Sequence, residues 1–495
     1  MARQSEKSKT LTALGLKPAQ GGDVAITGLS VDSRLTKPGH LFVALPGVNV
    51  HGAEFIQFAR RMGAVAVLTD ATGAELAAAD LGDLAVIVSD NPRKTLAETS
   101  ALWFGAQPET MVAVTGTNGK TSVACFTRQI WEALGLRAVN FGTTGVEGCV
   151  AAQLSHTTPE PITLHNLLRD LADQDVGYAA MEASSHGLAQ NRLDGVRLKA
   201  AGFTNFTQDH LDYHKDFDEY FEAKAGLFGR VLPAEGVAVV NMDDPRGKDM
   251  AAVAGARGQT VLRVGAAENA DLRILGQRFD ATGQELRFSY TGQTHLVRLA
   301  LIGGFQAGNV LMAAGLAIAC GADAGEVFKT LPTLETVLGR MQLAATRKNK
   351  ASVFVDYAHT PAALETALQA LRPHVLGRLI VVFGAGGDRD RSKRPLMGKA
   401  AIENADVVFV TDDNPRGEVP ADIRADIMAA CPQATEIDDR AAAILAGVDA
   451  LGPGDTLLIA GKGHETGQTI GDDVLDFSDI EQASVAVAAL DGMGI

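Results

Sequence analysis

The chain has 495 residues, which is enough for about three domains that each bury a core of their own. With 46% hydrophobic and 21% charged residues, its composition is that of an ordinary globular protein, and no apolar run approaches the roughly 18 residues of a membrane span. A formal charge of −15 argues against a nucleic-acid partner, because phosphate backbones select basic surfaces. The N-terminus lacks the apolar segment of a secretory signal and the four cysteines are scattered, so we expect a cytoplasmic protein.

Three stretches of the chain alternate apolar strands with helical segments, a pattern typical of α/β layers built on parallel sheets. We predict domains at residues 1–108, 109–340 and 341–495. The first contains the strands GHLFVALPG, AVAVLTD and LAVIVSD, the second opens on MVAVTGTNGKT, and the third contains ASVFVDYAH, LIVVFGAGGD, DVVFVTDDNPR and DTLLIAGKGHE. In the second and third stretches, polar motifs directly follow the strands, at the carboxyl ends where open parallel sheets bind ligands.

The tetrapeptide DNPR occurs twice, at residues 90–93 and 413–416. In the early copy, Asn91 can cap a helix that begins at Pro92 and continues through KTLAETSALWF, so we predict a strand-to-helix turn there. The late copy could cap a helix equally well. Its position beside two other motif loops favours a role in ligand binding.

The segment MVAVTGTNGKTS predicts a strand, a glycine-rich turn and a helix that begins near Lys120. Gly116 and Gly119 allow backbone N–H groups to face a phosphate, Lys120 can reach the terminal phosphates, and the Thr121 hydroxyl can bind Mg²⁺. Val114 stands where the general P-loop pattern has glycine. The alternative is a glycine-rich turn without a ligand, but the strand, lysine and threonine together favour a nucleotide site.

Two later strand ends and one helix carry candidate metal ligands. Glu182 ends the strand in GYAAMEASSHG, where its carboxylate could coordinate Mg²⁺ beside the P-loop. His210, in TNFTQDHLDYH, is either a hydrogen-bonded structural group or a metal ligand. Lys224, in the predicted helix FDEYFEAKAGLF, would ordinarily be solvated; burial would raise its neutral fraction and allow reaction with CO₂ to a carbamate, a carboxylate-like ligand.

Together these motifs resemble the ATP-dependent Mur ligases of peptidoglycan synthesis. The matching segments are VDSR, TGTNGKT, MEASSHGL, TNFTQDHLDYH, EAKAGLF, GGFQAGN, GRMQ, DYAHTP, FGAGGDRDRSKRPLMG, TDDNPR and GKGHE. The resemblance implies a domain for the UDP end of the substrate, a central P-loop ATPase with a parallel sheet, and a C-terminal Rossmann-like domain for an amino acid. It implies amide formation through an acyl phosphate by a monomer, with ATP as co-substrate, Mg²⁺ as cofactor, and UDP-N-acetylmuramoyl-dipeptide and meso-diaminopimelate as the other substrates.

Carried over residue by residue, the resemblance also implies a role for each matched position. The catalytic residues would be Lys120, Glu182, His210 and Lys224, with Mg²⁺ held by Thr121 and Glu182 and by His210 and carbamylated Lys224. The ATP contacts would be Gly116, Thr117, Asn118, Gly119, Lys120, Thr121, Asn309, Arg340, Asp356 and His359. The UDP-substrate contacts would be Val31, Ser33, Thr157, Thr158, Ser184, Gln190 and Arg192. The amino-acid contacts would be Arg389, Asp413, Asn414, Pro415, Arg416, Gly461 and Glu465.

The choice of amino acid depends on Arg416. Meso-diaminopimelate differs from lysine by one carboxylate, which an arginine can bind with two parallel hydrogen bonds, and lysine-adding relatives lack this arginine. Glu465 suits the ammonium group. The alternatives are a lysine-adding ligase, a folylpolyglutamate-type synthetase, which lacks the VDSR module, and a nucleotide-dependent switch that ligates nothing and leaves the amino-acid cluster unexplained.

Overall fold

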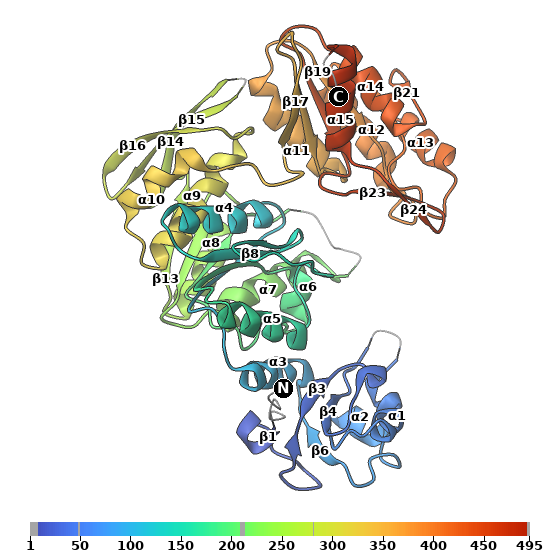
Figure 1. The fold of residues 1–495 in the computed structure, drawn as a ribbon. Coiled ribbons are helices and arrows are strands. Elements are labelled where there is room, and N and C mark those ends of the chain that lie inside the picture. The colour runs from blue at the N-terminus through green and yellow to red at the C-terminus, as the bar shows by residue number, and fades with distance from the viewer. Residues whose placement is uncertain (1–7, 48–49, 208–212, 281, 493–495) are drawn as a thin grey trace, which may run out of the picture. The chain divides into compact units, whose positions relative to one another are not determined.

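The computed structural model describes residues 8–47, 50–207, 213–280 and 282–492. Contacts divide the chain into two compact units, Met1–Val264 with Met312–Asp323, and Gly265–Leu311 with Ala324–Ile495. Each unit combines helices with a sheet whose strands are largely parallel, and the second unit adds an antiparallel meander, which confirms the predicted α/β class (Figure 1). No helix in the described ranges is long and apolar enough to cross a membrane. The division at residues 108 and 340 stays a prediction.

The N-terminal part contains a four-stranded parallel sheet in the order β3–β4–β5–β6, at the blue end of Figure 1. Its elements are β3 Gly28–Ser30, β4 His40–Val43, β5 Ala66–Thr69, β6 Ala85–Val88, α1 Ile56–Arg61, α2 Ala71–Leu76 and α3 Pro92–Phe104. Successive strand residues face opposite cores: Leu68 joins one buried cluster and Val67 the other. The Asn91 side chain accepts the Lys94 N–H at 3.0 Å and Pro92 is the first residue of α3, which confirms the turn predicted for the early DNPR.

The central sheet of the first unit has the order β13–β12–β11–β7–β10–β8–β9 and is parallel except for the last pair. Its strands are β7 Thr110–Thr115, β8 Ala138–Gly142, β9 Gly145–Gly148, β10 Tyr178–Glu182, β11 Ala200–Phe203, β12 Val237–Asn241 and β13 Thr260–Gly265. Its helices are α4 Lys120–Ala133, α5 Pro161–Asp173, α6 Ser185–Ala189, α7 Phe217–Gly226 and α8 Gly247–Ala256. Every residue of β7 is buried, as expected for a central strand covered on both faces.

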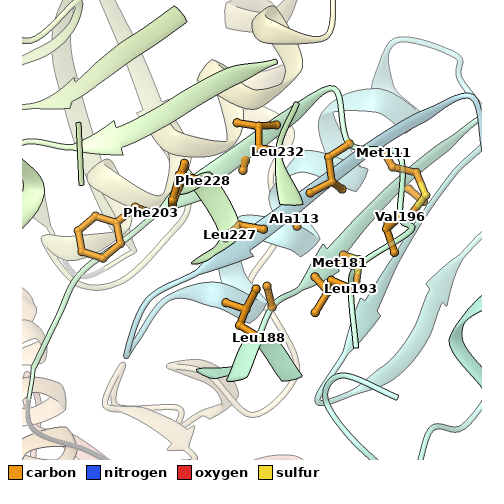
Figure 2. Close-up of a cluster of buried hydrophobic side chains, with 14 of the residues drawn as sticks. Met111, Ala113, Met181, Leu188, Leu193, Val196, Phe203, Leu227, Phe228 and Leu232 are labelled. Atoms are coloured by element: carbon orange, nitrogen blue, oxygen red, sulfur yellow. The ribbon is translucent and has the colours of Figure 1, made fainter. Parts of the chain in front are cut away.

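One core of this unit packs against the face of the sheet that includes Met111 and Ala113 of β7 (Figure 2). Met181 of β10 and Phe203 of β11 belong to the same cluster. The register pairs Glu182 with Val114 and Phe203 with Thr115, so the carboxyl ends of these strands lie level. The loops that follow them therefore share one edge of the sheet.

His165 gives the first unit a predictable acid sensitivity. It is buried on α5, its Nε2 has no hydrogen-bond partner among the described residues, and burial lowers its pKa from 6.5 to about 4. The unfolded chain therefore takes up a proton near pH 6.5 and the folded chain only near pH 4, so stability falls as the pH drops through this window. We expect His165→Asn to remove about 3 kcal/mol of this pH dependence, measured by urea unfolding between pH 4 and 7.

The matched control is His156→Asn, because His156 is exposed. This variant should unfold with the acid dependence of the unaltered protein. An unchanged acid slope in His165→Asn would show that another group titrates.

The second unit contains an antiparallel meander and a six-stranded sheet. The meander is β14 Leu272–Asp280, β15 Gly283–Tyr290 and β16 Gln293–Leu299, and the helices α9 Phe305–Ala319 and α10 Ala324–Thr330 follow it in sequence. The sheet has the order β17–β18–β22–β19–β20–β21 with only β17 antiparallel. Its strands are β17 Gln342–Thr346, β18 Ser352–Asp356, β19 Leu379–Phe383, β20 Val407–Val410, β21 Thr435–Glu436 and β22 Thr456–Ala460.

Helices cover both faces of the six-stranded sheet (orange to red in Figure 1). One buried cluster includes residues of α11 Pro361–Leu371, α12 Lys393–Asn404 and α13 Pro420–Met428, and the other includes residues of α14 Arg440–Asp449 and α15 Asp479–Leu490. The adjacent strands β18, β22, β19 and β20 end at Asp356, Ala460, Phe383 and Val410. The register pairs each of these residues with the next, so the four strand ends lie level. The four motif loops predicted from the sequence thus leave the sheet at one edge.

Candidate functional site

The predicted phosphate loop connects β7 to α4. Gly116 has φ +144° and Gly119 has φ +84°, and a side chain at Gly116 would overlap the Thr204 hydroxyl, so the turn requires glycine there. The Lys120 Nζ donates to the carbonyls of Gly116 at 2.9 Å and Thr117 at 2.8 Å. Thr121 follows in the buried first turn of the helix, and the Asn118 N–H donates to Asn205 Oδ1 at 2.8 Å. The structure thus brings the two glycines, the lysine and the start of α4 together in one turn, and their predicted role in binding phosphate stays a prediction.

Lys224 of α7 is buried against this loop. Its side chain is 1% exposed, its Nζ donates to Gly116 O at 2.8 Å, and it lies 4.4 Å from the centroid of the Tyr220 ring. The Tyr220 hydroxyl in turn lies 3.2 Å from Thr117 Oγ1. The burial on which carbamate formation depends is therefore present, although a surface position is the usual one for a helical lysine.

Glu182 ends β10 next to the phosphate loop and is buried. Its Oε1 accepts the Thr143 N–H at 2.8 Å and its Oε2 accepts the Thr143 hydroxyl at 3.2 Å. The Thr143 hydroxyl also lies 3.1 Å from that of Thr157. Thr143 was missed in the sequence analysis, although it directly follows the buried strand VNFG, as the other motif residues follow their strands.

The other predicted substrate contacts of the first unit belong to the same network. The Thr158 hydroxyl donates to Glu182 O at 3.0 Å and accepts the Ser184 N–H at 3.1 Å. Arg192 donates to Thr158 O at 2.6 Å and to Gln190 Oε1 at 2.9 Å. The structure thus brings together Thr158, Glu182, Ser184, Gln190 and Arg192, the first and last of which lie 34 positions apart in the sequence.

Val31 and Ser33 lie after β3 in the N-terminal part. Ser33 is buried in a short 3-10 helix capped by Asp32, whose side chain accepts the Arg34 N–H at 2.8 Å. Val31 lines a pocket together with Gln190 and other residues. A residue predicted to contact the uridine end of the substrate and one predicted to contact the muramoyl dipeptide therefore line the same pocket of this unit.

His210 lies outside the described residues, so its predicted part in a metal site stays a prediction. Within the described ranges, no group of three or more His, Cys, Asp or Glu side chains is arranged to hold a metal ion.

Two of the predicted nucleotide contacts in the second unit meet after β18. The Asp356 carboxylate is buried and accepts the N–H groups of Met341 at 2.7 Å and Ala358 at 2.8 Å. Burial raises the pKa of Asp356, and the positive charge of Arg340 opposes this. The Arg340 guanidinium lies 4.5 Å from the centroid of the Tyr357 ring. A charged and an aromatic group are thus held together at the strand end.

His359 and Asn309 complete the predicted nucleotide contacts in this unit. His359 is exposed in the loop after β18, with its Nδ1 2.9 Å from Tyr357 O. Asn309 is buried on α9 and donates to Gln306 Oε1 at 3.0 Å.

The late DNPR segment forms the centre of a polar cluster. Asn414 Nδ2 donates to Glu465 Oε2 at 3.0 Å, and Asn414 Oδ1 accepts from Lys462 Nζ at 2.9 Å and from the Thr469 N–H at 3.0 Å. The Lys462 side chain is fully buried and its Nζ lies 3.4 Å from the same Glu465 oxygen. Lys462 was missed from the sequence, although GKGHE contains it directly after the buried strand β22.

Arg416 has an unusual backbone. Its φ is +51°, a left-handed conformation that is rare outside glycine, asparagine and aspartate. The Arg416 N–H donates to Thr469 O at 3.1 Å and its carbonyl accepts the Gly471 N–H at 2.7 Å. Its Nη1 donates to Gly387 O at 2.9 Å, which joins the DNPR loop to the GGDRD loop.

The GGDRD loop that carries exposed Arg389 is held by Glu418. This carboxylate accepts the Asp388 N–H at 2.6 Å and hydrogen bonds from Arg391 at 2.6 Å and Arg394 at 2.8 Å. The Arg394 contact and the others lower the pKa of Glu418 to about 2. The loop is therefore tied to the DNPR segment while Arg389 remains accessible.

Beneath the cluster, Arg440 and Asp479 form a fully buried pair through two contacts of 2.7 Å. Arg440 also donates to the carbonyl of Asp412 at 3.2 Å and of Ala460 at 3.0 Å, at the starts of two motif loops. Gly461 follows with φ +122°, and a side chain there would overlap the Asp413 carboxylate. The pair fixes the positions of both loops.

We expect Asp479→Asn to lower the free energy of unfolding by about 3–5 kcal/mol, because it leaves the Arg440 charge buried and uncompensated. Urea unfolding of the full chain would measure this. The control is Asp449→Asn at the exposed end of α14, which should leave stability within about 0.5 kcal/mol. Equal stability of the two variants would contradict the assignment.

The two DNPR copies therefore differ in structure. Asn91 caps a helix, whereas Asn414 binds Lys462 and Glu465, and the next helix, α13, begins only at Pro420. The alternative of a second helix cap is wrong for the late copy. The Gln468 side chain donates to Asp413 O at 2.7 Å and fixes the segment further.

Family models match three successive segments of the chain. Residues 25–103 match the Mur ligase family catalytic domain, residues 114–317 the Mur ligase middle domain, and residues 339–463 the Mur ligase glutamate ligase domain. A relative from Mesorhizobium japonicum, named UDP-N-acetylmuramoyl-L-alanyl-D-glutamate–2,6-diaminopimelate ligase, is 49% identical over 478 residues that cover 96% of this chain and 98% of the relative. The chain belongs to the Mur ligase family.

Solved structures agree with the assignment of this chain to the Mur ligase family. One of a UDP-N-acetylmuramoyl-L-alanyl-D-glutamate–2,6-diaminopimelate ligase is 34% identical, covers 94% of this chain and 95% of its own, and superposes with a TM-score of 0.71. The MurF ligase of Thermotoga maritima, solved in complex with ADP, is 18% identical with a TM-score of 0.60 over 93% of this chain and 97% of its own, which shows a shared fold.

Proposed function

We propose that this Mur ligase joins meso-2,6-diaminopimelate to UDP-N-acetylmuramoyl-L-alanyl-D-glutamate at the expense of ATP. The observation that carries the proposal is the cluster of Arg416, Asn414 and Glu465 around one strand edge. An amino-acid terminus carries an ammonium and a carboxylate, for which a carboxylate and a guanidinium are the complementary groups. The names of the relatives support the same substrates. Arg389, Asp413, Pro415 and Gly461 complete the proposed amino-acid site.

ATP would bind at the phosphate loop. Lys120 would balance the charge of the terminal phosphates, and the loop N–H groups would bind their oxygens. The complex of the Thermotoga maritima relative with ADP supports a nucleotide co-substrate. The proposed contacts are Gly116, Thr117, Asn118, Gly119, Lys120, Thr121, Asn309, Arg340, Asp356 and His359.

The residues beside the loop fit Mg²⁺. Glu182 offers a buried carboxylate and Thr121 a hydroxyl, and Mg²⁺ is usually held by one or two carboxylates together with phosphates and water rather than by a cage of acids. When bound, the ion would neutralise phosphate charge. Lys224, as a carbamate, and His210 are proposed for a second ion.

The chain's own residues would then act mainly by positioning. The D-glutamate γ-carboxylate attacks the γ-phosphate of ATP and displaces ADP, and the diaminopimelate amine then attacks the resulting acyl phosphate, loses a proton and displaces phosphate. Thr157, Thr158, Ser184, Gln190 and Arg192 would hold the muramoyl dipeptide, and Val31 and Ser33 the uridine end. Holding the reactants in place can supply roughly 7–11 kcal/mol.

The test measures phosphate release from ATP with UDP-N-acetylmuramoyl-L-Ala-D-Glu and either meso-diaminopimelate or L-lysine. We expect rapid release with diaminopimelate and only slow release with L-lysine. Equal use of lysine would overturn the amino-acid assignment, and release that is indifferent to any amino acid would indicate a nucleotide switch.

A further inference from the structure

The pocket lined by Val31 has a volume of about 70 Å³ and is also lined by two arginines from distant parts of the chain. Arg93 lies in the first turn of α3, as the last residue of the early DNPR, and Arg192 lies after α6. Val31 and Leu96 give the pocket an apolar side, and Gln190 lies beside Arg192. Arg93 had no predicted role beyond the helix turn.

Neither arginine has a carboxylate within ion-pair distance among the described residues. Arg93 Nη2 donates to the Pro46 carbonyl at 2.6 Å, and Arg192 donates only to neutral oxygens. The remaining charged group of the pocket, Glu160, uses both carboxylate oxygens to accept the N–H groups at the start of α5, at 2.8 Å each. Two guanidinium groups thus face one pocket whose lining carboxylate, Glu160, is bound by backbone N–H groups and forms no ion pair with either arginine.

The pKa of Arg192 reflects its burial and also the charge of Arg93. Burial lowers the pKa of Arg192, the charges of Tyr213 and Glu160 oppose this, and the charge of Arg93 lowers it further, which places the two cations within electrostatic reach. Guanidinium groups present planar sets of N–H donors that match phosphate and carboxylate oxygens. The pocket therefore has the chemistry of an anion site.

We propose that Arg93 is a ligand of the diphosphate of the UDP-linked substrate. The inference rests on the proposed function and assigns one of its groups. Val31 stands at the uridine end and Gln190 and Arg192 at the muramoyl-dipeptide end, and the diphosphate is the part of the substrate that connects them. The early DNPR would then have two roles: Asn91 and Pro92 begin the helix α3, and Arg93 binds the diphosphate.

The test compares UDP with uridine as competitors of the UDP-linked substrate in the ligase assay. The ratio of their inhibition constants, uridine over UDP, measures what the diphosphate contributes. We expect Arg93→Ala to lower this ratio roughly tenfold or more, the loss of a charged hydrogen bond, and to leave the KM values for ATP and diaminopimelate unchanged. The control is Lys94→Ala, the exposed next residue, which should keep the ratio of the unaltered protein.

An unchanged ratio in Arg93→Ala would overturn the inference, as would weaker binding of UDP and uridine by the same factor, since that result means that Arg93 only supports the backbone at Pro46. Either result leaves the proposed function standing if the unaltered protein ligates diaminopimelate. Failure of the unaltered protein to ligate would refute the function itself.

Discussion

Arg416→Ala lowers kcat/KM for meso-diaminopimelate by roughly 100-fold or more and leaves the KM values for ATP and the UDP-linked substrate unchanged. The guanidinium is the group that would bind the carboxylate absent from lysine, and its removal leaves that carboxylate without its charged partner. The slow activity with L-lysine should change little. Arg416→Lys should give an intermediate rate, because a lysine keeps the charge but not the two parallel donors. Steady-state phosphate release with each amino acid measures all of these values.

The matched control is Arg372→Ala, which removes an arginine that pairs with Asp406 at the surface of the same unit. This variant should keep the diaminopimelate kinetics of the unaltered protein. If Arg416→Ala lost activity equally with both amino acids, Arg416 would support the loop rather than select the substrate.

Lys224→Ala abolishes most of the ligase activity, by roughly 100-fold or more, and a short carboxylic acid such as acetate or formate restores part of it. A carbamate at Lys224 would supply the carboxylate that the acid replaces. Because Lys224 also binds Gly116 O in the phosphate loop, loss of activity alone would not separate a metal ligand from a structural support. Rescue separates them, since an added acid repairs only the missing carboxylate.

A spectroscopic measurement avoids the acid lability of carbamates. Protein equilibrated with ¹³C-bicarbonate should show a carbamate carbon signal by NMR that Lys224→Ala lacks. Lys248→Ala is the control, because Lys248 is an exposed lysine of the same unit and should leave both signal and activity intact. Full activity of Lys224→Ala would refute the assignment.

The strand ends of both sheets were predictable from the sequence because each buried strand is a short apolar run, and register in parallel sheets brings their carboxyl ends to one edge. Glu182 was found in this way, and the position of the late DNPR copy beside other motif loops pointed to Asn414, whereas Asp356 was predicted from the resemblance to the Mur ligases. The identities of the chain's relatives confirm the family, and the roles of these residues stay predictions.

Buried cations were harder to find. Lys462 and Arg440 read as ordinary surface residues, because their burial depends on partners 48 and 39 positions away. Lys224 carried a usable local signal: it lies four residues after Tyr220 and three after Phe221, so it shares the buried face of α7 with both. Arg93 carried none, since its pocket forms only when α3 packs beside the loop after α6.

The left-handed backbone at Arg416 has a consequence for how substrate choice can evolve. A large side chain is held there in a conformation that glycine or asparagine adopts at less cost, so the residue that would select diaminopimelate lowers the stability of its own loop. Replacement of Arg416 by glycine or asparagine would therefore relieve backbone strain at this position, at the cost of the hydrogen bond to Gly387 O. In a lineage whose enzyme came to use a different amino-acid substrate, we expect Arg416 to be replaced early.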